Sequence, residues 1–165
     1  MSGLFSRDNK IELCNGFTAY FDEEDNAYFC DVPWLGRNVR VRLSGGDYDE
    51  TENEGLKELF ERFWSDRDSL FKQGQKDIKE KLLPYMAKKK KNGFFDYPIM
   101  SEDDFDADYW LTLVQIAYAE DMWKEVHLFF GKLDDEEQYD EICVERDLDT
   151  GKLSFNVSGW PIDDI

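Results

Sequence analysis

The sequence predicts an α+β domain in which two helices pack on one face of an antiparallel sheet, in the order βββ-αα-ββββ. Apolar and polar residues alternate before residue 45 and again after residue 108, as in half-buried strands, whereas the segment between has a helical spacing of apolar residues. The chain has 165 residues, including 13 Phe, 8 Tyr and 5 Trp. This length and aromatic content suit one core, so we assign residues 1–165 to a single domain.

Residues 11–44 are predicted to form a three-stranded antiparallel meander. Its clearest strand is VRVRL, in which Val39, Val41 and Leu43 alternate with two arginines. This alternation is typical of a strand with one buried face. The following segment, SGGDYDETEN, ends the strand pattern and opens a helix.

From Glu52 onward the apolar residues follow a helical period. One stripe contains five of them: Leu56, Leu59, Phe60, Phe63 and Trp64. Such a stripe is more typical of core than of a binding surface. The segment SDRDS interrupts it and predicts a second helix, which carries Leu70, Phe71, Ile78 and Leu82. Pro84 lacks an N–H group and predicts an end or a kink of that helix near Leu83.

The second half of the chain predicts four strands. Before these strands, Ser101 and Asp104 have the spacing of a capping box and indicate that a short helical turn starts there. Residues 109–119, YWLTLVQIAYA, are apolar on both faces and predict a central strand, with residues 124–131 as its partner. The segments EQYDEICVER and KLSFNVSGW complete a second meander.

The segment DLDTGK, residues 147–152, has acidic residues spaced as at the start of a calcium loop. An EF-hand loop needs glycine at position 6 and glutamate at position 12, but counting from Asp147 these positions hold Lys152 and Ser158. EF-hand loops also join helices, whereas both flanking segments here are strand-like. The segment therefore predicts a β-hairpin in which Gly151 has a positive φ, and no metal site.

The formal net charge of −18 bears on the partner. A surface this acidic repels phosphates, which disfavours DNA or RNA as a ligand, and attracts basic proteins. Solubility alone is an equally open explanation of the charge.

No apolar run is long enough to span a bilayer, and the first residues lack the layout of a signal peptide. Three widely spaced cysteines, Cys14, Cys30 and Cys143, suggest buried thiols in a reducing cytoplasm.

The sequence offers a single histidine as the base of a nucleophile–base pair. The single histidine, His127, lies in an apolar strand on the side opposite Val126, Leu128 and Phe130, where a packed or surface role is more typical than a catalytic one. With one histidine, structural zinc is not expected, and no motif indicates a cofactor. We therefore expect a non-enzyme, with no metal and no cofactor; the alternative is a carboxylate-dependent hydrolase or a metal-binding enzyme.

The densest acidic segment gives a candidate contact surface for a basic protein partner. Residues 134–149 hold nine Asp or Glu residues and one Arg, and among them Tyr139 is a candidate aromatic anchor. The predicted partner-binding residues are Asp134, Asp135, Glu136, Glu137, Tyr139, Asp140 and Glu141. Two tryptophans outside this segment, Trp34 and Trp160, are expected to be mainly structural.

Several segments together resemble an uncharacterised bacterial domain-of-unknown-function family (2262-like). They are VPWLGRNVRVRL, DIKEKLLPYM, SEDDF and EICVERDLDTGKLSFNVSGW. The resemblance spans residues 17–160 and its motifs are structural, so it implies no active site; the family's pattern has a histidine after the late glycine, where this chain has Lys132 after Gly131. The chain is also similar in kind to immunity proteins of bacterial toxin systems, which implies a role in neutralising a basic toxin.

Overall fold

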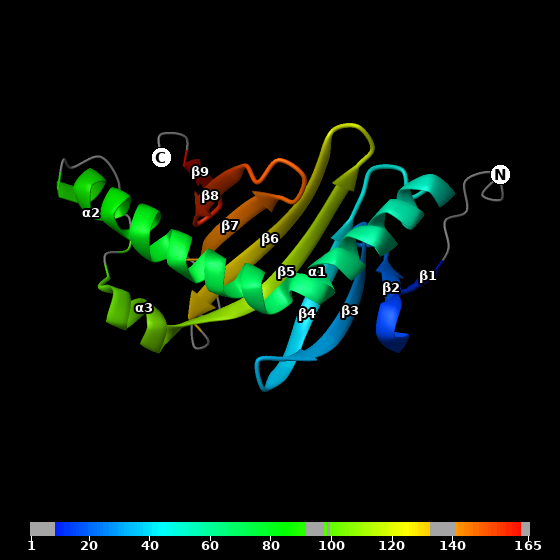
Figure 1. Ribbon diagram of the computed structural model, residues 1–165, viewed down its shortest axis with the longest axis horizontal. Helices are drawn as coiled ribbons and strands as arrows, with labels where there is room; N and C mark the ends of the chain where they lie inside the picture. The colour runs from blue at the N-terminus through cyan, green and yellow to red at the C-terminus, as the bar shows by residue number, and fades with distance from the viewer. Residues whose placement is uncertain (1–8, 92–97, 99, 133–140, 163–165) are drawn as a thin grey trace.

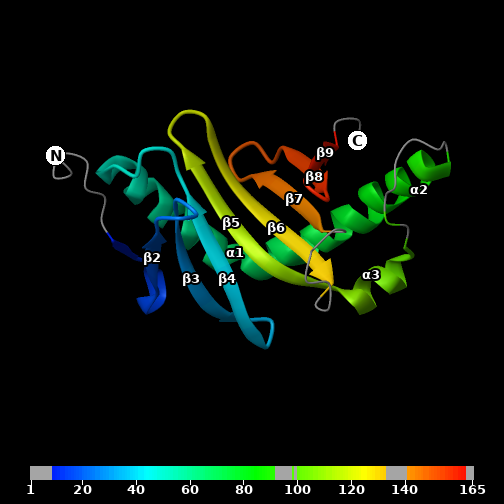
Figure 2. The same cartoon turned by 180° about the vertical axis from the view of Figure 1, so that it is seen from behind.

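The computed structural model describes residues 9–91, 98, 100–132 and 141–162. Within them a single sheet contains nine strands in the order in which they occur along the chain. A long helical segment crosses one face of this sheet (Figure 1), and the opposite face is not covered by any helix of the described residues (Figure 2). The strands are β1 (Lys10–Glu12), β2 (Thr18–Asp22), β3 (Ala27–Trp34), β4 (Arg37–Ser44), β5 (Tyr109–Ala119), β6 (Trp123–Lys132), β7 (Ile142–Asp147), β8 (Leu153–Val157) and β9 (Trp160–Ile162).

One strand pair differs from the others in direction. β4 and β5 are parallel, with Val41 opposite Val114 and Ser44 opposite Ala117, whereas every other neighbouring pair is antiparallel. Parallel strands need a long crossover connection between them. The helical segment, which lies between β4 and β5 in the sequence, provides this crossover.

The crossover is one continuous helical segment. It consists of α1 (Glu50–Asp77), a π-helical stretch (Ile78–Leu82) and α2 (Leu83–Lys91). The predicted break at residues 65–69 is wrong, because a tertiary contact holds this part of α1 in place: the indole Nε1 of Trp34 donates a hydrogen bond to Asp68 Oδ1 at 2.9 Å. A local contact adds to it, since the guanidinium of Arg67 lies 3.8 Å from the ring centroid of Trp64, three residues earlier in the same helix.

Pro84 does not end the helical segment, but the turn that precedes it is not regular α-helix. A proline removes one helical hydrogen bond, and its ring crowds the carbonyl four residues earlier. The π-helical stretch, which ends two residues before Pro84, widens the turn where this crowding occurs. The expected irregularity is therefore present, but the helix continues to Lys91.

The predicted order βββ-αα-ββββ is wrong, although the general α+β layout is present. Four strands precede the helical segment, and a short helix, α3 (Glu102–Asp108), and five strands follow it. The unpredicted strands, β1 and β9, have three residues each. The capping box at α3 is confirmed: Asp104 N–H donates to Ser101 Oγ at 3.1 Å, and Ser101 N–H donates to the Asp104 carboxylate at 3.5 Å.

The core lies between the sheet and α1. Its helical side chains are those of the predicted stripe, with Leu56, Leu59, Phe60 and Phe63 buried. Trp34 is also buried and packs edge-on against Phe63, with ring centroids 5.7 Å apart, so its structural role is confirmed. Trp160 is 74% exposed, which contradicts the expected structural role.

Gly55 of α1 packs directly against Tyr118 of β5. A Cβ at this position would lie 2.2 Å from Cζ of the buried Tyr118. We expect Gly55→Ala to lower the free energy of unfolding by about 1–3 kcal/mol, because overpacking outweighs the roughly 1 kcal/mol that alanine gains in a helix.

Gly74→Ala is the matched control within the same helix. A Cβ there would meet only the end of the Leu128 side chain, at 3.1 Å, so this variant should be near neutral or slightly stabilising. Urea denaturation of the two variants measures the difference. Equal changes at the two positions would contradict the close contact between Gly55 and Tyr118.

Candidate functional site

A groove lies beside the part of the β5–β6 hairpin that extends past the end of β4. β4 ends at Ser44, opposite Ala117, and the chain then turns towards α1 while β5 continues to Ala119. Both views show the β5–β6 turn next to the connection from β4 to α1 (Figures 1 and 2). This acidic groove has a volume of about 580 Å³. It is lined by Ser44, Gly45, Gly46, Asp47, Asp49, Glu52, Gln115, Ala117, Tyr118, Ala119, Glu120, Met122, Trp123, Glu125 and His127.

The charge of the acidic groove has one sign. Five of its lining residues are carboxylates, namely Asp47, Asp49, Glu52, Glu120 and Glu125, and none of the described lining residues is lysine or arginine. The carboxylates come from the β4–α1 connection, the start of α1, the β5–β6 turn and β6. A concave surface lined by one sign of charge concentrates oppositely charged groups.

Two of these carboxylates also hold the start of α1. Asp49 is the N-cap residue, and its Oδ1 accepts a hydrogen bond from the Glu52 N–H at 2.8 Å. Glu52 in turn accepts a hydrogen bond from the Tyr48 N–H at 2.9 Å. The Glu52 carboxylate packs against Gly45, where a Cβ would lie 2.1 Å from Oε1. Asp49 and Glu52 are therefore fixed by the fold, which preorganises this wall of the groove.

The rim of the acidic groove carries two exposed apolar side chains. Met122 is 70% exposed and Trp123 is 41% exposed, both at the β5–β6 turn. Large apolar side chains next to charged groups on a concave surface are typical of protein-binding sites, where aromatic residues act as anchors. Two of the three exposed groove carboxylates, Asp47 and Glu120, accompany them.

The inner end of the acidic groove reaches the helix-free face of the sheet. In register across β4 to β8, Arg42, Gln115, His127, Glu145 and Ser154 form one row of polar residues. The expected outward position of His127, opposite its buried neighbours, is confirmed. Its Nε2 lies 3.3 Å from Glu125 Oε1, so this histidine is held by a carboxylate of the groove.

The thiol of Cys143 lies close to His127 but is poorly suited to act as a nucleophile. Cys143 is 3% exposed, and burial, followed by the negative charges of Glu145, Glu141 and Glu125, raises the pKa of its thiol. Because the thiolate is the reactive form, this environment opposes nucleophilic chemistry by the bare side chain.

Most residues of the predicted contact segment lie outside the described residues. These are Asp134, Asp135, Glu136, Glu137, Tyr139 and Asp140. The remaining one, Glu141, lies just before β7; burial raises the pKa of its carboxyl, and its backbone carbonyl accepts a hydrogen bond from the Ser158 N–H. The partner-binding role of this segment stays a prediction.

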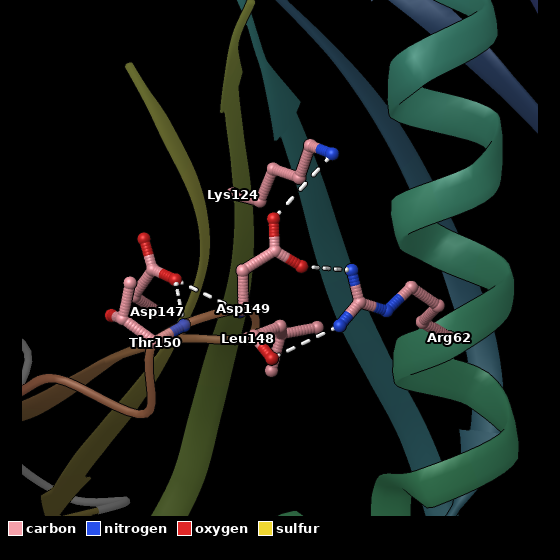
Figure 3. A network of polar contacts seen from close by, with 6 residues as sticks. All are labelled: Arg62, Lys124, Asp147, Leu148, Asp149 and Thr150. Carbon is pink, nitrogen blue, oxygen red and sulfur yellow. Dashed lines mark hydrogen bonds and ion pairs between the residues drawn. The ribbon is translucent and has the colours of Figure 1, made fainter. Parts of the chain in front are cut away.

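The hairpin predicted at residues 147–152 is confirmed, and its acidic side chains are engaged by the protein itself (Figure 3). Asp147 Oδ1 accepts hydrogen bonds from the N–H groups of Asp149 and Thr150, both at 2.8 Å. Asp149 pairs with Arg62 at 2.9 Å and with Lys124 at 3.5 Å. Gly151 has a φ of 74°, as the turn requires. The Arg62–Asp149 contact connects the hairpin to α1, and both carboxylates have a structural role in the turn.

The Arg62 contact predicts a pH dependence of stability. The hydrogen bond from Arg62 is the main cause that lowers the pKa of Asp149 below its ordinary value. A carboxyl with a lowered folded-state pKa stabilises the fold above its unfolded pKa of about 4, and this contribution is lost as the pH falls through the folded value.

We therefore expect Asp149→Asn to lower the Tm at pH 7. The difference in Tm between this variant and the wild type should become smaller below about pH 4. Thermal unfolding followed by circular dichroism between neutral and acidic pH measures this difference. A difference that stays constant or widens in acid would mean that the Arg62–Asp149 contact does not contribute through its charge.

Sequence reasoning missed the acidic groove. Its residues Asp47, Glu120, Met122 and Trp123 are far apart along the chain or lie in a turn, and only the parallel pairing of β4 with β5 brings them together. The alternation around His127 did indicate that this side chain faces outward, but not which residues of other strands are its neighbours. Acidic residues at helix ends and in turns do not indicate a binding site by themselves, because they are frequent throughout this chain.

Among the described residues, no helix combines the length and the apolar character needed to cross a membrane. Comparisons with protein-family models, with curated proteins and with solved structures found no match. The resemblance to the domain-of-unknown-function family therefore stays a prediction, and the functional conclusion depends on the geometry of the site.

Proposed function

We propose that the protein binds a basic segment of a partner protein in the acidic groove. The observation that carries this proposal is the lining of the groove, where five carboxylates and two exposed apolar side chains meet without a lysine or arginine among the described lining residues. Each carboxylate offers acceptors for the N–H groups of arginine or lysine. Trp123 offers a ring face against which a guanidinium can stack.

The charge of the whole chain supports the same kind of partner. A formal net charge of −18 attracts a basic protein over a distance set by ionic screening, about 8 Å at physiological ionic strength. It disfavours a nucleic acid, whose phosphates the groove would repel. A toxin that acts on nucleic acid fits this description, because its own substrate site must be basic, so neutralisation of such a toxin is the form of the function that we favour.

The proposed location is the cytoplasm. The described cysteines Cys14, Cys30 and Cys143 are free thiols, which suits a reducing compartment. The predicted partner-binding role of the acidic segment 134–141 remains part of the proposal, separately from the groove.

An NMR titration with an oligo-arginine peptide tests the location of the site. We expect the largest amide shift changes in the β4–α1 connection and the β5–β6 turn, around Asp47 and Glu120, and a loss of these changes in high salt. Changes spread evenly over all acidic surfaces would mean that the groove has no special affinity for basic groups.

The apolar anchor is tested by Trp123→Ala, with Trp160→Ala as the matched control. Trp160 is the more exposed of the two, at 74%, and does not line the groove. We expect Trp123→Ala to weaken peptide binding about tenfold, mainly by raising the dissociation rate, and Trp160→Ala to leave it unchanged. Equal effects of the two changes would remove Trp123 from the site.

A further inference from the structure

Three side chains of different metal-ligating types meet on the helix-free face of the sheet. His127 in β6 and Glu145 in β7 are directly opposite each other, and Cys143 lies two residues before Glu145, so all three project on the same face. One potential ligand atom from each residue, an imidazole nitrogen, Sγ and a carboxylate oxygen, lies within 4.8 Å of the other two. Ligand atoms around one tetrahedral zinc ion are roughly 3.5 Å apart, because each lies about 2.0–2.3 Å from the ion. Small side-chain rotations would therefore bring the three atoms onto one ion.

The electrostatic environment of the three residues favours a cation. The Sγ atom of Cys143 is buried, and the carboxylates of Glu145, Glu141 and Glu125 lie near enough to surround it with negative charge. A divalent cation would offset this negative charge and take the thiol as a thiolate, since zinc ligands bind in their deprotonated forms.

Neighbouring polar groups hold two of the potential ligands in place. Glu125 Oε1 lies 3.3 Å from His127 Nε2, and Asn156 Nδ2 donates a hydrogen bond to Glu145 Oε1 at 2.5 Å. A carboxylate that holds one nitrogen of a histidine while the other binds the metal is the usual outer contact of a zinc site. The polar row of the sheet thus supplies both potential ligands and the groups that orient them.

We propose that His127, Cys143 and Glu145 bind one zinc ion. A set of one nitrogen, one sulfur and one oxygen suits Zn²⁺ rather than Ca²⁺ or Mg²⁺, which prefer oxygen alone. Three protein ligands leave a fourth position for water, as in catalytic zinc sites. The single histidine of the sequence argued against zinc, but the pairing of β6 with β7 places a thiol and a carboxylate beside it.

Titration of the whole protein with Co²⁺, in place of Zn²⁺, tests this site spectroscopically. We expect a thiolate-to-cobalt charge-transfer absorption and tetrahedral d–d bands at one equivalent, both abolished by added Zn²⁺. Cys143→Ser should remove the charge-transfer absorption, whereas Cys30→Ser, which changes another buried cysteine in β3, should keep it. Glu125→Gln, at a positioning residue, should weaken Zn²⁺ binding about tenfold.

One decisive outcome needs no variant, and the others are read only on variants that remain folded. A wild-type protein that gives no charge-transfer absorption with Co²⁺ would overturn the zinc site, and so would an absorption that survives in folded Cys143→Ser. Glu145→Gln, which retains the shape of the side chain, should weaken the d–d bands; unchanged bands would exclude Glu145 as a ligand and overturn the three-residue site. Because Cys143 and Glu145 do not line the acidic groove, failure of this test is distinguishable from failure of peptide binding.

Discussion

Replacement of Asp77 by alanine is expected to lower the free energy of unfolding by about 3–5 kcal/mol, among the largest effects of any single substitution in this protein. Asp77 is 3% exposed and is the one buried acidic or basic residue of the described chain. Its carboxylate pairs with Arg146 of β7, accepts a hydrogen bond from Gln73 Nε2 at 3.0 Å, and lies 3.7 Å from Lys81 Nζ. The substitution would leave Arg146 without its partner in a partly buried position.

Two further variants separate the charge from the packing. Asp77→Asn keeps the shape and should lose less stability than alanine. The double variant Asp77→Leu with Arg146→Met should recover much of the loss, because well-packed apolar residues often replace a buried ion pair at little cost. Urea denaturation measures all three, and a double variant no more stable than Asp77→Ala would show that the ion pair is not what Asp77 contributes.

Phe63→Ala is expected to cost a similar 3–5 kcal/mol. Phe63 is fully buried in α1, with ring centroids 5.7 Å from Trp34 of β3 and 6.0 Å from Phe60. Truncation would remove one of the aromatic contacts between the helix and the N-terminal part of the sheet and would leave a cavity. Phe63→Leu keeps more of the apolar volume and should cost clearly less.

Intrinsic fluorescence, to which Trp34 and the other four tryptophans contribute, follows the unfolding of these variants. Chemical denaturation should show a lower midpoint for Phe63→Ala with an unchanged m-value, since the same surface is exposed on unfolding. A loss below about 1 kcal/mol would mean that α1 does not depend on this contact for its position.

The sequence predicts those elements whose signal is local. Alternation in Val39, Val41 and Leu43 predicts β4, and the apolar stripe that begins at Leu56 predicts the buried face of α1. The run at residues 109–119 coincides with β5. In each case the side chains that face the core are fixed by a period that neighbouring residues repeat.

The sequence-based predictions are wrong where tertiary contacts determine the secondary structure or the strand pairing. The polar residues 65–69 favour a helix break, but Asp68 accepts a hydrogen bond from the distant Trp34 and α1 continues. β1 and β9 are too short to show a period. The parallel pairing of β4 with β5 joins residues on either side of the helical crossover, and no local pattern reports it.

The candidate site could be predicted only in part for the same reason. Alternation places His127 on the outer face of its strand, and Cys143 and Glu145 on one face of theirs, but the register that makes them neighbours is tertiary information. Likewise, acidic residues are so frequent that composition could not distinguish Asp47 or Glu120 from solvated charge. Sequence alone directed attention to the densest acidic run, whereas the structure brings together acids from separate segments.

The most direct test of the central claim compares two variants of equal charge. The groove variant carries Asp47→Asn, Glu120→Gln and Glu125→Gln, and it spares the capping residues Asp49 and Glu52. The helix variant carries Glu58→Gln, Glu61→Gln and Asp66→Asn, at three exposed positions of α1. Both replace three carboxylates by neutral amides of nearly the same shape.

Stopped-flow measurement of association with the oligo-arginine peptide at low ionic strength then separates the groove from the net charge. We expect the association rate constant of the groove variant to fall about tenfold, because the charges that focus the field at the site are removed, and that of the helix variant to fall much less. Equal decreases in the two variants, or an unchanged rate for the groove variant, would contradict binding in the acidic groove and would leave net charge as the explanation of the acidic composition.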